Sequence, residues 1–184
     1  TPLRLAASTR PIVLSVVSTE EEFDWARPFE RHATTVRAAQ RLHEVQRVFD
    51  EFGVRPAYLV DYPIATHEES AAMLREIHAG GRCEIGAHLH PWVSPPHEEQ
   101  VTPRNSFPGN LPAELEARKL HVLTQTIEQA FGARPRSYQA GRYGCGPNTA
   151  ALLEREGYEI DLSASPPFDF RGEGGPDYSR TPLE

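Results

Sequence analysis

The sequence predicts an α/β fold in which parallel strands alternate with helices and form a barrel. Apolar, β-branched runs typical of strands buried on both faces alternate with segments of helical periodicity. Alternation of this regularity indicates parallel strands with helices outside, arranged either as an open doubly wound sheet or as a barrel. No glycine-rich motif for a nucleotide phosphate follows a strand, which favours the barrel.

Five segments are expected to form strands. Each is a short run rich in aliphatic or aromatic residues and is bounded by residues typical of turns. The first, PIVLSVVS, is almost wholly apolar, as expected for a central strand of a parallel sheet. In chain order, the expected strands are 11–18, 56–63, 83–90, 136–141 and 158–165.

Helices are expected between consecutive strands, because apolar residues recur there every three or four positions. Capping residues and glycines indicate where these helices begin and end. The expected starts are Thr34 or Thr35, a capping box at Thr66–Glu69, Pro112 and Asn148, and the first three helices are expected to end at Gly53, Gly80 and Gly132.

Size and composition narrow the classes of function. With 184 residues, the chain suits a single domain spanning 1–184. A composition of 39% hydrophobic and 24% charged residues is ordinary for a globular protein. The net charge of −7 argues against a nucleic acid partner, since the chain offers no excess of cations for phosphates. No apolar run is long enough for a membrane span.

The cysteines and the chain ends bear on location. Cys83 and Cys145 are far apart in sequence and are expected to be two free thiols of an intracellular enzyme. No export signal is visible, so a cytoplasmic location is expected. The chain opens with Thr1 rather than methionine, which leaves secretion after processing as an alternative.

Acids and histidines follow the expected strands. The first strand leads into Glu20, Glu21 and Glu22, and the third ends in His88 and His90. The carboxyl ends of barrel strands meet at one rim, where carboxylates and imidazoles could bind a divalent metal. His88 and His90 point the same way in an extended strand, because side chains alternate with period two. A hydrogen-bonded pair without metal is the alternative for the histidines, and a solvated charge cluster is the alternative for the glutamates.

Two tryptophans lie beside these polar residues. Trp25 follows the glutamates and Trp92 follows the histidines. Each indole is expected either to stack on a sugar face or to belong to the core. Cys145 is expected to be an ordinary thiol rather than a nucleophile, since no histidine neighbours it in sequence.

Together, these motifs resemble the polysaccharide deacetylases of the NodB-homology type, carbohydrate esterase family four. The resemblance runs from Val13 to about Ser165 through the stretches STEE, GAHLHPW, YQAGRYG and DLSAS. The forms TEEEFDW and EIGAHLHPW are similar to those of the divergent WalW-like subgroup. The resemblance implies a distorted (β/α) barrel of seven strands. The family's general-acid histidine has no counterpart here, so either the fold continues past residue 184 or this protein lacks that residue.

The resemblance also implies roles for individual residues. Glu20 would be the general base, and Glu21, His88 and His90 would bind the metal, although the family's second histidine position is occupied here by Trp92. The family's arginine, which pairs with the base, is replaced by Gln139, and Arg142 is expected to serve instead. The remaining implied residues are Asp161 as a catalytic acid, Trp25, Trp92 and Tyr143 as substrate-binding residues, and a backbone N–H near Arg142 and Tyr143 as a donor to the oxyanion.

The function implied is metal-dependent removal of N-acetyl or O-acetyl groups from a glycan. Zinc is the expected ion, with cobalt, manganese, iron and nickel as alternatives. One alternative function is that of another metal-dependent amidohydrolase. The other is a carbohydrate-binding domain of deacetylase type without activity, because the family's arginine and second spaced histidine are replaced.

Overall fold

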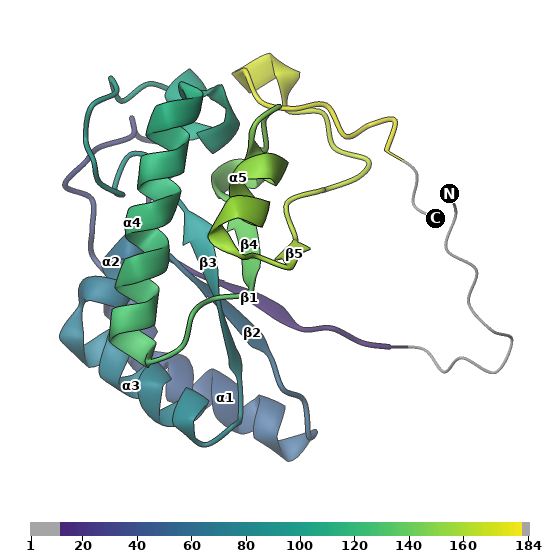
Figure 1. Ribbon diagram of the computed structural model, residues 1–184. Coiled ribbons are helices and arrows are strands. Elements are labelled where there is room, and N and C mark those ends of the chain that lie inside the picture. Colours follow the sequence, from purple (N-terminus) through teal and green to yellow (C-terminus); the bar gives the residue numbers. More distant parts are fainter. Residues whose placement is uncertain (1–11, 182–184) are drawn as a thin grey trace, which may run out of the picture.

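The computed structural model describes residues 12–181, whose centre is one parallel sheet (Figure 1). Its five strands lie in the order of the sequence, and every neighbouring pair is parallel. This confirms the predicted α/β class and the approximate positions of all five strands, although each strand is shorter than expected and residue 11 of the first expected strand lies outside the described residues. The strands are β1 (Val16–Thr19), β2 (Ala57–Val60), β3 (Glu84–Leu89), β4 (Ser137–Ala140) and β5 (Ile160–Asp161).

The helices form one layer, in which helices that follow one another along the chain pack side by side. Helix α1 packs on α3, α3 packs on α4, and α4 packs on both α5 and strand β3. Figure 1 shows α4 and α5 crossing in front of the sheet. The helices are α1 (Leu42–Glu51), α2 (Tyr62–Thr66), α3 (Glu68–Ala79), α4 (Ala113–Phe131) and α5 (Thr149–Glu156). Short 3-10 helices are η1 (Arg37–Arg41), η2 (Arg104–Ser106), η3 (Pro108–Asn110), η4 (Gly141–Tyr143) and η5 (Arg171–Glu173).

The observed ends of the helices agree with those expected from the sequence better than the observed starts do. Gly132 ends α4 with φ 73°, a left-handed conformation that glycine adopts without a steric penalty. The capping box expected at Thr66 is wrong, because Thr66 is the last residue of α2 and its hydroxyl donates to the carbonyl of Tyr62. Helix α2 is instead capped by Asp61, whose carboxylate accepts the N–H of Ile64 at 2.9 Å.

The core lies between this helix layer and one face of the sheet. Tyr58 and Val60 of β2, together with Ala87 and Leu89 of β3, belong to the buried cluster that packs against the helices. The intervening residues, such as His88, point to the opposite face. The two faces are therefore chemically distinct: the helix-facing side is apolar, and the other side carries polar residues.

The polar face is concave. The Ser18 hydroxyl on β1 lies 3.1 Å from Oε1 of Gln139 on β4, although two strands stand between them. In a flat sheet these strands would lie about 14 Å apart, three spacings of about 4.8 Å. Strong curvature, sequential strand order and helices on one side are the features of a barrel wall. A doubly wound sheet would instead reverse its strand order at a switch point.

The loop between β3 and α4 is fixed by a buried lysine. Nζ of Lys119, on α4, donates to the carbonyl of Pro91 at 3.0 Å and lies 3.1 Å from the carboxylate of Glu99. Both side chains are almost fully buried, so the ion pair attaches the loop firmly to the helix layer. This attachment holds the segment that follows His90.

The structure also bears on the cysteines and on membrane-spanning helices. Cys83 and Cys145 are both free thiols, as expected. Across residues 12–181, no helix combines the length and the hydropathy needed to cross a bilayer.

Candidate metal centre

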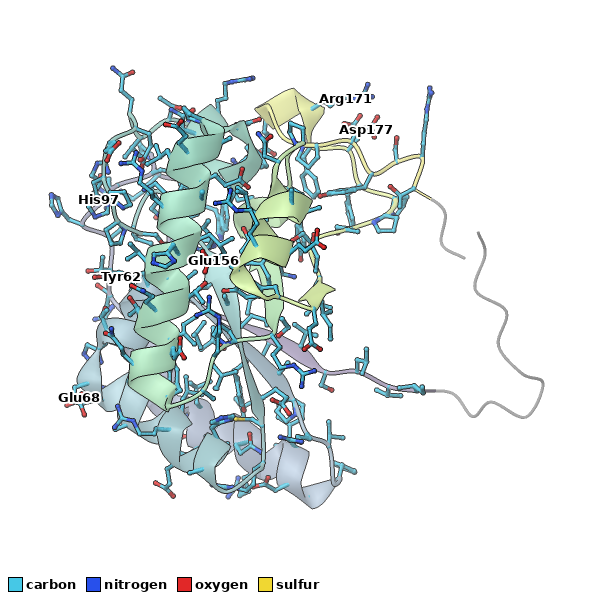
Figure 2. All side chains as sticks on the ribbon, in the orientation of Figure 1. Tyr62, Glu68, His97, Glu156, Arg171 and Asp177 are labelled. Carbon is cyan, nitrogen blue, oxygen red and sulfur yellow. The ribbon has the colours of Figure 1, made fainter. Side chains whose placement is uncertain are left out.

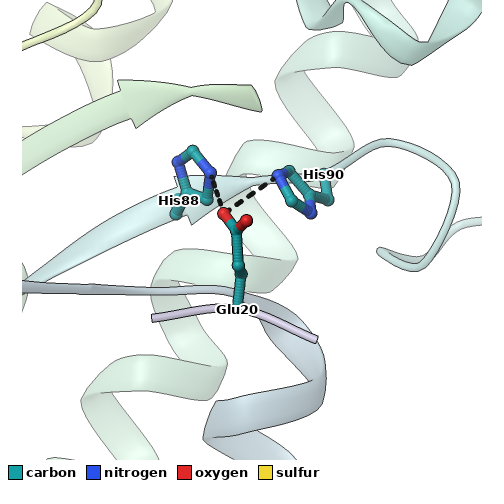
Figure 3. A group of neighbouring side chains, drawn as sticks. All are labelled: Glu20, His88 and His90. Atoms are coloured by element: carbon teal, nitrogen blue, oxygen red, sulfur yellow. Dashed lines mark ion pairs between the residues drawn. The ribbon is translucent and has the colours of Figure 1, made fainter. Parts of the chain in front are cut away.

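A carboxylate and two imidazoles meet on the concave face, at the carboxyl ends of β1 and β3. Oε2 of Glu20 lies 2.9 Å from Nε2 of His88 and 3.5 Å from Nε2 of His90 (Figure 3). The two imidazole rings are 4.5 Å apart between centroids. His88 and His90 share a face because strand side chains alternate, as the sequence predicts.

The outer nitrogen of each ring is held by an oxygen. Nδ1 of His88 lies 3.1 Å from the carbonyl oxygen of Gln139, and Nδ1 of His90 lies 2.9 Å from Oε2 of Glu21. Carbonyl and carboxylate oxygens accept hydrogen bonds, so in each neutral ring Nδ1 carries the proton and Nε2 keeps its lone pair. Both lone pairs are therefore available toward Glu20.

Burial sets the charge of these groups. Burial lowers the pKa of His88 and of His90, which keeps both imidazoles neutral near neutral pH. Burial alone would raise the pKa of Glu20, but its contacts with His88 and His90 outweigh this effect, and the pKa lies below its usual value. The cluster thus offers one anionic oxygen and two neutral nitrogens.

A second, fully buried cluster lies behind His90. Glu21, Asp61 and His90 bring potential ligand atoms within 4.8 Å of one another. Burial raises the pKa of Glu21 to about 7 and that of Asp61 well above its usual range. Asp61 accepts the backbone N–H of Glu21 at 2.9 Å, which fixes the end of β1 against the end of β2. Glu21 therefore orients His90 from the side opposite to Glu20.

The first cluster fits a divalent ion. Glu20, His88 and His90 each contribute one donor atom, and all three atoms lie within 4.8 Å of one another. Imidazole nitrogen and carboxylate oxygen suit Zn, Fe, Mn or Co, and histidine ligands in metal sites usually donate their other N–H to an oxygen, as both do here. These three residues could therefore hold a divalent ion, and both imidazoles are already oriented for it.

These three residues line a cavity of about 140 Å³. Trp25 and Tyr143 contribute aromatic surface to it and remain 59% and 39% exposed, respectively. Among the described residues that line the cavity, Glu20 is the only carboxylate. The complete lining is Ser18, Glu20, Trp25, His88, His90, Gln139, Arg142 and Tyr143.

Trp92 does not reach this cavity. Its indole is 1% exposed and stacks on the ring of His90, with centroids 4.2 Å apart and an interplanar angle of 24°. Its Nε1 has no hydrogen-bond partner among residues 12–181. Of the two placements expected for this residue, the structure shows the one in the core, where the indole supports His90 and has no face open to a sugar.

Asp161 also lies away from the cavity. It pairs in register with Tyr138, which faces the helices, so its side chain points to the helix side of the sheet. There it accepts from the hydroxyl of Ser163 at 2.5 Å and lies 3.4 Å from the sulfur of Cys145. The register of β5 therefore places the Asp161 side chain on the face of the sheet opposite to the histidines.

Burial raises the pKa of Cys145 to about 12, in keeping with an unreactive thiol.

Arg142 lines the cavity but does not pair with Glu20 in any contact of the described residues. Its guanidinium donates to the hydroxyl of Ser106 at 2.8 Å, forms an ion pair with Glu173 and stacks over Phe107 at 4.1 Å. Arg142 and Tyr143 have φ of 56° and 58°, a left-handed conformation that costs a non-glycine residue about 1–2 kcal/mol. This turn projects both side chains toward the cavity.

Sequence reasoning missed the pairing of Ser18 with Gln139 on the cavity floor. Gln139 stood out as the replacement of an arginine, but nothing in the sequence marked Ser18 as its partner. It also missed the position of Asp61 behind Glu21, although an acid directly after a strand was the available signal.

Comparisons with known proteins support the fold. No family model and no curated protein matches the sequence. Among solved structures, a proposed polysaccharide deacetylase from Mycobacterium smegmatis is 24% identical, with a TM-score of 0.51 over 67% of this chain and 39% of that one. The chitin deacetylase of the fungal pathogen Colletotrichum lindemuthianum is 13% identical, with a TM-score of 0.53 over 80% of this chain and 54% of that one.

A pseudoenzyme of the CE4 family matches as well. This protein from Bacillus anthracis is 13% identical, with a TM-score of 0.50 over 67% of this chain and 38% of its own. The chain has the fold of the CE4 deacetylases. It spans between 38% and 54% of the length of these three proteins. The shared fold covers active and inactive proteins alike, so activity has to be argued from the residues of the cavity.

Proposed function

We propose that this protein is a divalent-metal-dependent hydrolase that removes acetyl groups from a glycan, as a divergent, WalW-like member of the deacetylase family. The observation that carries the proposal is the convergence of Glu20 with Nε2 of His88 and His90 at the floor of a cavity. The likeness to deacetylase structures supports it, since chitin deacetylase is among the proteins with this fold.

Glu20, His88 and His90 would hold the ion, and zinc suits this donor set best. When bound, such an ion polarises a carbonyl and lowers the pKa of a coordinated water. This assignment differs from the division that the family resemblance implies, in which Glu21 is the ligand. Glu21 faces Nδ1 of His90 instead, so we assign it the role of orienting this ring.

The other residues of the cavity would bind substrate and move a proton. Glu20 is the only carboxylate among the described residues that line the cavity, so both roles would fall on it: Oε2, which faces the two imidazoles, would bind the ion, and the other oxygen would accept the proton of the attacking water. Trp25 and Tyr143 offer exposed ring faces for the sugar. A cavity of about 140 Å³ admits an acetyl group with the adjoining part of one sugar ring, and the remaining substrate lies outside it.

A double substitution tests the proposal. We expect His88→Ala with His90→Ala to abolish zinc binding, measured by elemental analysis after dialysis, and to abolish acetate release from acetylated chitooligosaccharides. The circular dichroism spectrum should be retained. His121→Ala is the matched control, because His121 is an exposed histidine of α4 that pairs with Glu156 at 3.0 Å.

Two results would count against the proposal in different ways. Full zinc retention by the double variant would refute the assignment of His88 and His90 as metal ligands. Glycan binding by the wild-type protein without acetate release from any acetylated oligosaccharide would indicate a binding domain rather than an enzyme.

A further inference from the structure

The side chain of Arg142 is enclosed although it lines the cavity. It is 8% exposed, and its guanidinium forms an ion pair with Glu173 of η5. Nη1 donates to the hydroxyl of Ser106 at 2.8 Å and to the carbonyl of Pro103 at 3.3 Å. The edge of the guanidinium is thus held by two segments, the loop before α4 and the segment after β5.

Aromatic rings surround the same guanidinium. Its Cζ lies 4.1 Å from the ring centroid of Phe107, 5.3 Å from that of Phe29 and 5.8 Å from that of Trp25. Cations are attracted to the faces of aromatic rings, and the attraction is strongest where water is excluded. Arg142 therefore joins Phe107, in the loop before α4, to the segment 23–29 that follows the glutamates.

This contact bears on Trp25 in particular. The segment 23–29 contains no helix or strand, so the direction of its side chains depends on their own contacts. The indole of Trp25 lines the cavity and is 59% exposed, which leaves it few packing partners. Phe23 and Phe29 contact it edge-on from its own segment. The contact with Arg142 joins the indole to the turn that follows β4.

The turn that carries Arg142 and Tyr143 needs support from outside. Their φ angles are 56° and 58°, and non-glycine residues keep such left-handed conformations only where the surrounding structure holds them. The side-chain contacts of Arg142 provide part of this support. The hydroxyl of Tyr178 provides another part, since it donates to the carbonyl of Tyr143 at 2.7 Å. The direction of the Tyr143 ring, which lines the cavity, follows from this turn.

The partner in the Arg142 ion pair is itself held in place. Glu173 lies in a hairpin of residues 168–178, whose two arms are joined by an antiparallel bridge. Arg171 pairs with Asp177 at 3.3 Å across this hairpin, and Figure 2 shows the two side chains side by side. The carboxylate that Arg142 binds therefore belongs to a segment with its own cross-links.

We infer that Arg142 is a positioning residue: it holds Trp25 and Tyr143 in the orientation in which they receive substrate, and it does not act in the chemical step. Its relevance to catalysis rests on the proposed function. A planar guanidinium donates hydrogen bonds at its edge while it stacks on aromatic rings, a combination that an ammonium group does not offer. Among the described residues, Arg142 forms no hydrogen bond or ion pair with the proposed metal ligands, so its loss should weaken substrate binding and leave the chemistry intact.

Two substitutions of Arg142 test this role. Arg142→Met removes both the charge and the planar group, whereas Arg142→Lys removes the planar group and keeps the charge. Glu173 is 63% exposed, so neither variant leaves a buried carboxylate without its cation. The matched control is Arg82→Met, because Arg82 also forms an ion pair, with Asp50 at 2.9 Å, and does not line the cavity. Circular dichroism checks that each variant is folded.

Two kinds of measurement report on the role. Acetate release from N-acetylated chitotriose gives kcat and KM, and a competition titration gives the affinity for zinc. Quenching of tryptophan fluorescence by acrylamide needs no substrate. It reports mainly on Trp25, because Trp92, the second tryptophan of the chain, is 1% exposed and shielded from the quencher.

We expect Arg142→Met and Arg142→Lys to raise KM about fivefold, the effect of about 1 kcal/mol of aromatic contact, and to leave kcat and zinc affinity unchanged. Quenching of Trp25 should rise in both variants, and Arg82→Met should behave as wild type. A lower kcat at unchanged KM would overturn the inference, because Arg142 would then take part in the chemistry. A wild-type KM in Arg142→Lys would overturn it as well, since the charge alone would suffice.

Ser106→Ala decides the question if the Arg142 variants do not fold. It leaves Arg142 in place and removes the hydroxyl that accepts from Nη1. A rise in both KM and the quenching of Trp25 would support the positioning role, and no change in either would overturn it.

The quenching experiment separates this inference from the proposed function. If no substrate releases acetate but quenching of Trp25 rises in both Arg142 variants and not in Arg82→Met, Arg142 positions Trp25 and only the hydrolytic function fails. If quenching is unchanged in both Arg142 variants, the inference fails whatever the activity.

Discussion

Replacing Glu21 by glutamine tests how the second, buried cluster supports the proposed metal ligands. Glu21 is 2% exposed, and its carboxylate lies 2.9 Å from Nδ1 of His90. A buried hydrogen bond to a charged group is worth about 1.5–3 kcal/mol, which corresponds to about 10- to 150-fold in Kd. At pH 8, above the Glu21 pKa of about 7, glutamine keeps an oxygen acceptor but removes the charge, so we expect the low end of this range, about a tenfold weaker affinity for zinc.

The assay is a competition titration of zinc against a chromophoric chelator. The matched control is Glu22→Gln, which removes the same charge one residue further along. Glu22 pairs with Arg37 at 3.2 Å and touches neither histidine in any described contact, so zinc affinity should not change. A Glu21→Gln protein that binds zinc within twofold of wild type would show that the carboxylate does not orient His90. Equal losses in both variants would point to a general charge effect.

Three further substitutions address parts of the structure that surround the site. Lys119→Met leaves the buried Glu99 with only its longer ion pair to Arg31, at 3.5 Å, and should lower the free energy of unfolding in urea by about 3 kcal/mol; a loss under 1 kcal/mol would refute the importance of the Lys119–Glu99 pair. Gly141→Ala places a Cβ against the backbone carbonyl of Leu89 and 2.7 Å from Cδ2 of His90, so stability and zinc affinity should both fall, whereas unchanged affinity would mean that the ring does not depend on this contact. Burial raises the pKa of Glu116 above its usual 4.5, so its stabilising contribution is complete below pH 4.5 and declines as pH rises through the folded-state pKa. Glu116→Gln does not titrate and should therefore gain stability relative to wild type between pH 4.5 and 8, and a pH-independent difference in urea midpoints would contradict this assignment.

Much of the fold follows from local patterns. All five strands were expected at their positions because each is a short apolar run between turn residues, and the glycine ends of α1 and α4 lie at or beside the expected residues. Starts of elements were less predictable, since several residue types can cap a helix. Thr66 shows this: a threonine followed three residues later by glutamate resembles a capping box, but Asp61 starts a short helix before it.

The candidate site could be predicted only in part. An H-x-H sequence on a strand places His88 and His90 on one face whatever the tertiary structure, because the alternation of side chains is a local property. The same alternation could not assign the three consecutive glutamates, since β1 ends at Thr19 and they lie beyond it. Trp92 likewise follows the end of β3, and its direction is set by the loop attached to Lys119.

The sequence by itself determined that strands and helices alternate and that acids and histidines follow the strands. Only the tertiary structure decided which of these acids and histidines lie in contact with one another. The curvature of the sheet brings β1 against β3 and β4, so that Glu20 reaches both imidazoles while Glu21 passes behind His90 to Asp61. The pairing register of β5 turns Asp161 to the helix side. Curvature and register arise from packing between segments far apart in the chain, and a local pattern carries no information about either.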